Sequence, residues 1–172
     1  MMKQIWDRKE DKMIKLLRID DRLIHGQVAV YMVKATSADT IVVASDQHAN
    51  NAILKMSLNV GKPAGCKMEI LTIVNTISYL NDSTNDKKNI LVVTGSCNSA
   101  LNLCQNCKGI EKVNLGGQRY AENKTSITNQ IFIDENDLND LMQIAELGID
   151  VYAQDTPSKE KISVKGIKAK FN

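Results

Sequence analysis

The chain has 172 residues, of which 24% are charged, and its formal net charge of +2 at pH 7 is close to balanced. This length suits one domain with a core of ordinary size, and the charge gives no general reason to expect binding to nucleic acid or to a membrane surface. No apolar run approaches the ~18 residues of a membrane-spanning helix. Residues 1–12 lack the apolar stretch of a secretory signal, so we expect a cytoplasmic protein.

Short apolar runs alternate with amphipathic segments after Met13, which could serve as an alternative start. We interpret residues 1–12 as a poorly ordered extension and residues 13–172 as a single domain. Ile14–Ile19 has the character of a first strand, and the four-residue spacing that follows it predicts a helix with Ile24, Val28 and Met32 on one face. Thr40–Ser45 suits a buried strand. The next helix contains Ile53, Leu54, Met56, Leu58 and Val60 and stops near Gly61–Pro63.

The second half of the chain continues this alternation. Strands are predicted at Lys67–Thr72, Asn89–Thr94, Lys112–Leu115, Gln130–Ile133 and, as the last one, Asp150–Ala153. Helices are predicted over Val74–Leu80, Ser99–Cys107 and Leu138–Ala145, the last of them capped by Asp134 and ended by Gly148. Asn81–Lys88 is interpreted as an exposed loop, and the lysine-rich Lys159–Lys170 as a solvated terminal segment, with a basic surface for an acidic partner as the alternative. This order predicts an α/β fold with an open, mostly parallel sheet and helices on both faces.

The four cysteines are interpreted as small buried hydrophobic residues. Cys104 and Cys107 form a C-x-x-C pattern, but a zinc site would need two further ligands that no nearby cluster supplies. A redox pair would normally lie at the start of a helix, whereas this pair lies late in a predicted one.

The segment Arg18–Val28 follows the first predicted strand and therefore lies at the edge of a parallel sheet where ligands collect. His25 falls at the start of the following helix, where free backbone amides favour an anion. A neutral imidazole is a good nucleophile near pH 7 and can pass a phosphoryl group on. We therefore predict that His25 carries a phosphoryl group.

Other residues of this segment suit supporting roles. Arg22 and Arg18 are the predicted positive partners of a phosphoryl group, and Gly26 and Gln27 leave amide donors beside it. Asp20 or Asp21 would orient the imidazole or hold an arginine in place. The simpler alternative is a surface or capping histidine next to a salt-bridge cluster. His48 is interpreted as a surface side chain, and Gly116–Gly117 as a tight turn.

The eleven residues R-I-D-D-R-L-I-H-G-Q-V closely resemble the active-site signature of IIB components of the mannose/fructose/sorbose family of the bacterial sugar phosphotransferase system. The resemblance extends over roughly residues 14–167 through Ala38–Val43 with Asp46 and Ala49–Asn50, Val113–Gly117, Leu147–Tyr152 and Pro157–Ser158. The segment Val60–Pro63, His48 and residues 1–12 depart from the family pattern.

This resemblance implies a specific activity. In the family, phospho-IIA transfers its phosphoryl group to the IIB histidine, which matches His25, and IIB passes it to a sugar bound by the IIC and IID membrane components. The family also implies transfer at Nδ1, no metal or nucleotide cofactor, and peripheral association with the permease. Because the chain has no room for a fused IIA, the IIA protein is expected on a separate chain. The sugar, of the mannose, fructose, sorbose or amino-sugar class, is chosen largely by the membrane components.

Two alternatives remain open at this stage. The chain could be a non-catalytic module that kept the fold for binding or regulation, although the intact loop argues against it. A nucleotide-binding α/β protein is weaker still, because the loop has neither common phosphate-binding glycine pattern.

Overall fold

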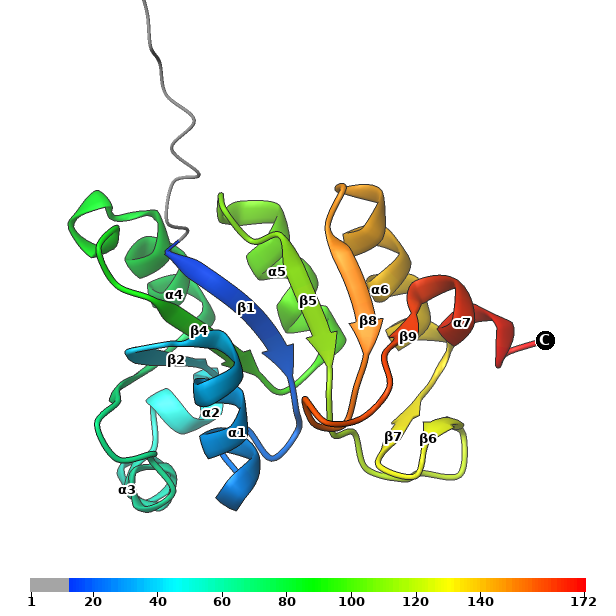
Figure 1. Cartoon of the computed structure of the whole chain (residues 1–172), viewed down its shortest axis with the longest axis horizontal. Helices are drawn as coiled ribbons and strands as arrows, with labels where there is room; N and C mark the ends of the chain where they lie inside the picture. The colour runs from blue at the N-terminus through cyan, green and yellow to red at the C-terminus, as the bar shows by residue number, and fades with distance from the viewer. Residues whose placement is uncertain (1–12) are drawn as a thin grey trace, which may run out of the picture.

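The computed structural model describes residues 13–172, and the predicted extension over residues 1–12 lies outside the described residues. Seven strands form one open sheet in the order β3-β2-β4-β1-β5-β8-β9. Every pairing in it is parallel except that of β8 with β9. The predicted α/β architecture is confirmed, and Figure 1 shows the parallel strands ending together along the lower edge of the molecule.

The elements alternate as the sequence pattern predicts. The sheet strands are β1 (Ile14–Ile19), β2 (Thr40–Ala44), β3 (Lys67–Leu71), β4 (Ile90–Thr94), β5 (Lys112–Leu115), β8 (Asp150–Ala153) and β9 (Ile162–Ser163). The helices are α1 (Gly26–Thr36), α2 (Asp46–Ala49), α3 (Ala52–Val60), α4 (Ile73–Asn81), α5 (Cys97–Asn106), α6 (Glu135–Glu146) and α7 (Val164–Ala169), with a short 3-10 turn, η1, at Ser83–Asn85. Strands β6 (Thr125–Thr128) and β7 (Ile131–Ile133) form a separate antiparallel hairpin.

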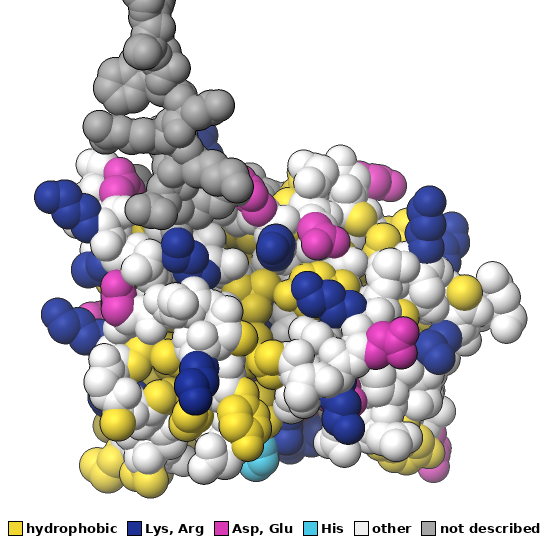
Figure 2. Space-filling view, viewed as in Figure 1, with side chains coloured by type: hydrophobic (Ala, Val, Ile, Leu, Met, Phe, Trp, Pro, Cys, Tyr) yellow, Lys and Arg dark blue, Asp and Glu magenta, His cyan; other side chains and the backbone are white. Residues whose placement is uncertain are grey.

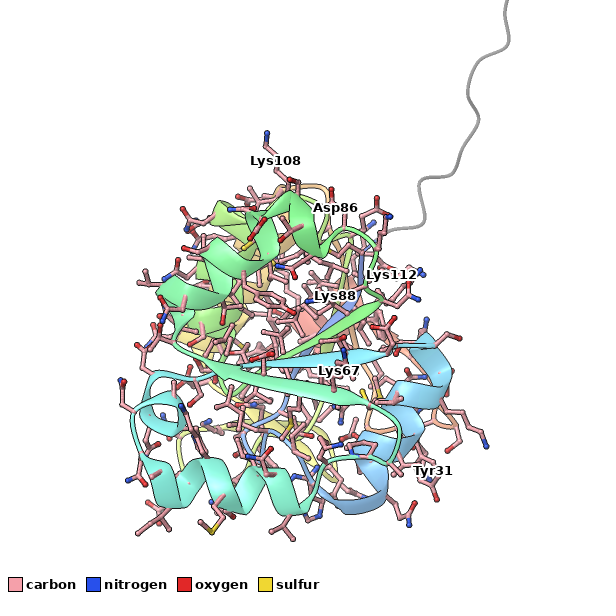
Figure 3. The ribbon with its side chains drawn as sticks, turned by 90° about the vertical axis from the view of Figure 1, so that its left-hand side faces the viewer. Tyr31, Lys67, Asp86, Lys88, Lys108 and Lys112 are labelled. Atoms are coloured by element: carbon pink, nitrogen blue, oxygen red, sulfur yellow. The ribbon has the colours of Figure 1, made fainter. Side chains whose placement is uncertain are left out.

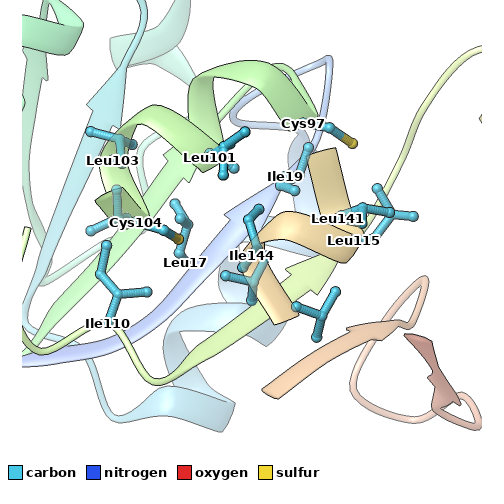
Figure 4. Packing of buried hydrophobic residues seen from close by; sticks show 14 of the residues in the cluster. Leu17, Ile19, Cys97, Leu101, Leu103, Cys104, Ile110, Leu115, Leu141 and Ile144 are labelled. Atoms are coloured by element: carbon cyan, nitrogen blue, oxygen red, sulfur yellow. The ribbon is translucent and has the colours of Figure 1, made fainter. Parts of the chain in front are cut away.

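The sheet separates two apolar layers, because successive side chains of a strand point to opposite faces. Leu17 and Ile19 join the larger layer with residues of α4, α5, α6 and α7, and Figure 4 shows α5 and α6 packed over β1 and β5. Leu16 joins the other layer, which contains Met32 of α1 and Leu58 of α3. All four cysteines are buried, as predicted.

Three predictions from the sequence need correction. The lysine-rich tail is not a solvated segment, because it forms β9 and α7 and buries Ile167 completely. Strand β8 is consequently not the last one. The predicted strand at Gln130–Ile133 is confirmed as β7, which lies in the hairpin outside the main sheet. The exposed loop at Asn81–Lys88 contains the 3-10 turn η1 with a buried Asn85.

Helix α3 differs from its prediction in the direction of its apolar face. Of its residues only Leu58 is buried, whereas Ile53, Met56 and Val60 are 78%, 68% and 85% exposed. Figure 3, which faces the edge strand β3, shows α3 crossing the bottom of the molecule below the sheet. Helical spacing alone therefore did not identify the buried side of this helix.

Candidate functional site

The site is built where β1 ends and the chain turns into α1. After Ile19, the amide of Asp20 donates to Thr94 O at 2.9 Å and the amide of Leu23 donates to Asp20 O at 2.9 Å, which closes a tight turn. Leu23 has a φ of 60° and is 7% exposed, so its burial holds the backbone in the left-handed region. Gly26, with a φ of +46°, then starts the helix at a position that favours glycine.

His25 is the N-cap residue of α1, which confirms its predicted place at the helix start. Its side chain is exposed and makes no capping hydrogen bond, so the ring is available to a partner. Gly26 and Gln27, the first residues of the helix, are also exposed. The first amides of a helix have no partner within the helix and carry its positive dipole end. An anion at His25 would therefore lie against favourable backbone charge.

Two arginines lie beside this turn and share the carboxylate of Asp20. Arg18 Nη2 donates to Asp20 Oδ2 at 3.1 Å, while Arg22 donates to Oδ1 through Nε at 3.1 Å and to Oδ2 through Nη2 at 3.2 Å. The backbone amide of Arg22 also donates to Oδ1, at 3.1 Å. The side chains of Arg18 and Asp20 are 3% and 1% exposed, and that of Arg22 is 27% exposed. Nη1 of Arg22 makes no hydrogen bond to the described residues.

Burial would raise the pKa of Asp20, but the hydrogen bonds from Arg22 and the charge of Arg18 outweigh it, and the pKa falls below its ordinary value. Burial lowers the pKa of Arg18, and the hydrogen bond to Asp20 raises that of Arg22. An arginine keeps its charge throughout the working range of pH. The cluster therefore stays charged at neutral pH, with Arg22 as its partly exposed end.

The end of β5 completes the support of the two arginines. Asn114 Oδ1 accepts from Arg18 Nη1 at 2.6 Å, and Asp155 O accepts from Arg18 Nη2 at 2.9 Å. A Cβ at Gly116 would lie 2.4 Å from Arg18 Cζ, and one at Gly117 would lie 2.7 Å from Arg22 Nη2. The two glycines therefore do more than form a tight turn, because they leave room for both guanidinium groups.

A depression of about 640 Å³ opens above this cluster, between the β1–α1 turn, α2 and the segment after β5. His25 and Arg22 line it from the turn, and they are joined by Asp21, Gln47, His48, Leu54 and Arg119. Asp21 Oδ2 accepts from the amide of Arg119 at 2.9 Å and lies 3.6 Å from Arg119 Nε. Figure 2 shows a histidine at the lower edge of the molecule with basic side chains next to it. This mixture of a free imidazole and two arginines suits a phosphoryl anion.

The family model for sorbose subfamily IIB components of the phosphotransferase system (PTS) matches residues 14–171 of this chain. The chain belongs to this family. A probable phosphotransferase enzyme IIB component of Streptococcus pyogenes is 32% identical, with 87% of this chain and 96% of that protein covered. An N-acetylgalactosamine-specific phosphotransferase enzyme IIB component of Escherichia coli is 30% identical over 86% of this chain and 94% of its own length.

The fold agrees with that of solved IIB structures. The IIB domain of the sorbose permease from Klebsiella pneumoniae superimposes with a TM-score of 0.86 at 22% identity, covering 91% of this chain and 97% of that one. This PTS IIB component thus takes part in sugar phosphotransfer. Within residues 13–172, no helix is long and apolar enough to cross a membrane.

The predicted site residues of this IIB component separate into two layers. His25, Arg22, Gly26 and Gln27 lie at the surface of the turn and the helix start. Arg18 is the exception among the predicted phosphate ligands, because it is 2% exposed and its donors already serve Asp20, Asn114 and two backbone carbonyls. Asp20 likewise lies below the depression rather than in it. In this structure Arg18 therefore supports Asp20 and lies below the surface of the site.

The sequence interpretation missed three parts of the IIB site. His48 is half-buried rather than a plain surface residue, and its Nδ1 lies 2.9 Å from Ser45 Oγ. Burial lowers its pKa. Arg119 and Asn114 were not singled out from the sequence. Each of the three lies in or just beyond the carboxyl half of a predicted strand. Because ligands of such sheets bind at this edge, the positions of the three residues in the sequence could have marked them as site candidates.

Proposed function

We propose that this IIB component accepts a phosphoryl group on His25 from a phospho-IIA protein on a separate chain. It then transfers the group to a sugar bound by IIC and IID membrane components. The observation that carries the proposal is an exposed, uncapped imidazole at the start of α1, which lines the same depression as Arg22. Nη1 of Arg22 makes no hydrogen bond to the described residues. The family model that matches residues 14–171, and thus includes this loop, supports the same assignment.

The proposed transfer is a pair of displacements at phosphorus. A neutral nitrogen of His25, Nδ1 by family resemblance, attacks the phosphoryl group, and the bond from phosphorus to the donor atom breaks with its electron pair returning to the donor. In the second step a sugar hydroxyl attacks, a P–O bond forms and the P–N bond breaks. The imidazole nitrogen recovers its electron pair, and the hydroxyl proton passes to a base or to water.

Each residue near His25 has a proposed part in these steps. Arg22 offers Nη1 to the equatorial phosphoryl oxygens, whose negative charge must be stabilised during transfer. The amides of Gly26 and Gln27 add the positive end of α1. Asp20 has both oxygens occupied by arginine donors, so of its two predicted roles we assign it that of holding Arg22. Arg18 acts one step further away, by holding Asp20.

The proposed partners follow from this relay. The phosphoryl donor is a IIA protein, and the acceptor is a sugar presented by the membrane components, with which this chain associates peripherally. We propose no metal or nucleotide cofactor, because the steps above require neither. Among residues 13–172, no group of three or more His, Cys, Asp or Glu residues is placed to hold a metal ion.

The test is phosphoryl labelling. Phosphoenolpyruvate, the general phosphotransferase proteins and a cognate IIA protein are expected to label the wild-type chain with an acid-labile, base-stable bond. His25→Ala should not be labelled, whereas His48→Gln should still carry the label because His25 remains. Wild-type protein that stays unlabelled with a competent IIA, while binding its partners normally, would favour the non-catalytic alternative. Saturable binding of a nucleotide would instead favour the nucleotide-binding alternative.

A further inference from the structure

Helix α3 carries an apolar stripe that faces solvent. Ile53, Met56 and Val60, which we call the α3 stripe, lie on one face of the helix by their spacing, and they are 78%, 68% and 85% exposed. The buried Leu58 faces the sheet instead. Single exposed apolar residues are common, but three neighbours on one helix face leave a contiguous patch that indicates a contact with another molecule.

The α3 stripe is continuous with the proposed phosphoryl site. Leu54, the neighbour of Ile53, lines the same depression as His25. At its other end α3 meets the β1–α1 turn, because a Cβ at Gly61 would lie 3.2 Å from Ile24 Cγ2, and Ile24 directly precedes His25. A protein that covers His25 therefore has α3 within its reach.

A second apolar patch flanks the depression on the opposite side. Tyr120 is 69% exposed and stacks edge-on against Phe132 of β7, with ring centroids 5.6 Å apart. It follows Arg119, which lines the depression. In Figure 2 hydrophobic side chains gather over α3 at the lower left and over the β6–β7 hairpin at the lower right, on either side of the histidine. Apolar contacts around a charged centre are typical of a protein-docking surface.

We propose that the α3 stripe and Tyr120 dock the protein that donates the phosphoryl group to His25. This inference rests on the proposed function. A specific interface covers roughly 800 Å² on each partner. A protein donor whose phosphoryl group reaches His25 therefore covers the elements on both sides of the depression.

The charge of the surface favours the donor over two other occupants. A second copy of this chain docked through a two-fold axis near His25 would bring two sets of Arg22 and Arg119 close together, and like charges in such a contact repel. Arg22 and Arg119 each pair with an aspartate, but Nη1 of Arg22 makes no hydrogen bond to the described residues and the side chain of Arg119 is 75% exposed. Both arginines can therefore still pair with a phosphoryl group that the donor carries. Once His25 carries the phosphoryl group, the negative charge of that group pairs with Arg22 and Arg119. The arginines then no longer attract the membrane acceptor.

The test compares a protein donor with a small one. Met56→Lys and Val60→Lys place a charge in the stripe at exposed helical positions that lysine tolerates well. We expect each to lower kcat/KM for labelling by phospho-IIA about tenfold, mainly through KM, because a few apolar residues carry much of the energy of an interface. Labelling by potassium phosphoramidate, which needs no docking surface, should stay within about twofold of wild type. Leu147→Lys is the matched control, since Leu147 is 51% exposed at the end of α6, away from the carboxyl edge.

The outcomes separate this inference from the proposed function. Stripe variants that phospho-IIA labels as fast as wild type would overturn the docking surface while leaving the relay intact. Normal labelling of the stripe variants by phospho-IIA, combined with slower transfer from phosphorylated IIB to sugar, would assign the stripe to the membrane acceptor. Loss of a wild-type dimer in sedimentation, with normal labelling, would assign it to a second copy. Wild type that neither donor labels would overturn the proposed function and the docking surface with it.

Discussion

The guanidinium group of Arg18 occupies the space that a side chain at residue 116 would need. A Cβ at Gly116 would lie within 2.4 to 2.8 Å of the terminal atoms of Arg18. Arg18 is 2% exposed and bonded to Asp20, Asn114 and backbone carbonyls, so it has nowhere to move. Gly116, directly after β5, is therefore required for Arg18 to be buried beneath the site.

Gly116→Ala should destabilise the fold. Displacing Arg18 breaks a buried ion pair and overfills the space, which together cost about 3 kcal/mol. Urea unfolding measures this loss. Gly95→Ala is the matched control, because a Cβ at Gly95 meets only Leu23 Cδ2 at an ordinary 3.7 Å. Equal stabilities of the two variants would contradict this account of Gly116.

Gly117→Ala should affect transfer more than folding. A Cβ there would lie 2.7 Å from Arg22 Nη2 and 2.9 Å from Asp20 Oδ1. Because Arg22 is partly exposed, its end can shift outward at a cost of about 1 kcal/mol in stability. The shift moves the group that is proposed to meet the phosphoryl oxygens, so labelling by phosphoramidate should slow about tenfold. An unfolding midpoint that falls sharply while labelling stays normal would reverse this assignment.

Arg22→Ala should slow phosphoryl transfer by about 3 kcal/mol in the activation barrier. From its surface position a small effect on folding would be expected, but the side chain is only 27% exposed and bonds a buried carboxylate. We therefore expect a loss of about 2 kcal/mol in stability as well. Arg22→Lys should keep the charge but not the two-pronged contact with Asp20, and should recover only part of the rate. Full recovery with lysine would show that charge alone suffices.

The ion pair of Asp20 should make stability depend on acid pH. Its pKa in the folded protein lies below the ordinary value of 3.8. The unfolded chain therefore takes up the proton first as the pH falls, and the stabilisation present above about pH 4 is lost progressively as the pH falls through the folded pKa. Urea unfolding at pH 7, 4 and 3 measures the slope. Asp20→Asn should flatten the slope or, by leaving Arg18 unpaired, prevent folding.

The buried cysteines should be unreactive in the native protein. Burial raises the pKa of Cys104 to about 12 and that of Cys107 to about 11, and it raises that of Cys97 well above the ordinary value. The thiolate that reacts is therefore scarce at neutral pH. A chromogenic disulfide reagent should titrate four thiols in denaturant and react slowly without it. Rapid reaction of the native protein at pH 7.5 would contradict the burial of these side chains.

Local sequence patterns predicted much of the fold. β-branched runs such as Thr40–Ala44 and Ile90–Thr94 became buried strands, and Asp134 caps α6 with a reciprocal hydrogen bond to Asp137. Such signals depend on neighbours in the chain, so a single sequence contains them. The prediction for the terminal segment was wrong because β9 and α7 depend on partners that are not their neighbours in the chain. Strand β9 pairs with β8, and Ile167 of α7 is buried in the core.

The sequence by itself determined the class of sheet, the edge at which the loop lies and the place of His25 at the start of a helix. Only the tertiary structure decided which of the two arginines near His25 is buried and which is partly exposed. Arg18 and Arg22 look equivalent in the chain. Asn114, Gly116 and Gly117, at and just after the end of β5, surround the guanidinium group of Arg18 and leave that of Arg22 partly exposed. Burial and charge pairing are set by residues about a hundred positions apart in the chain, so no local pattern encodes them.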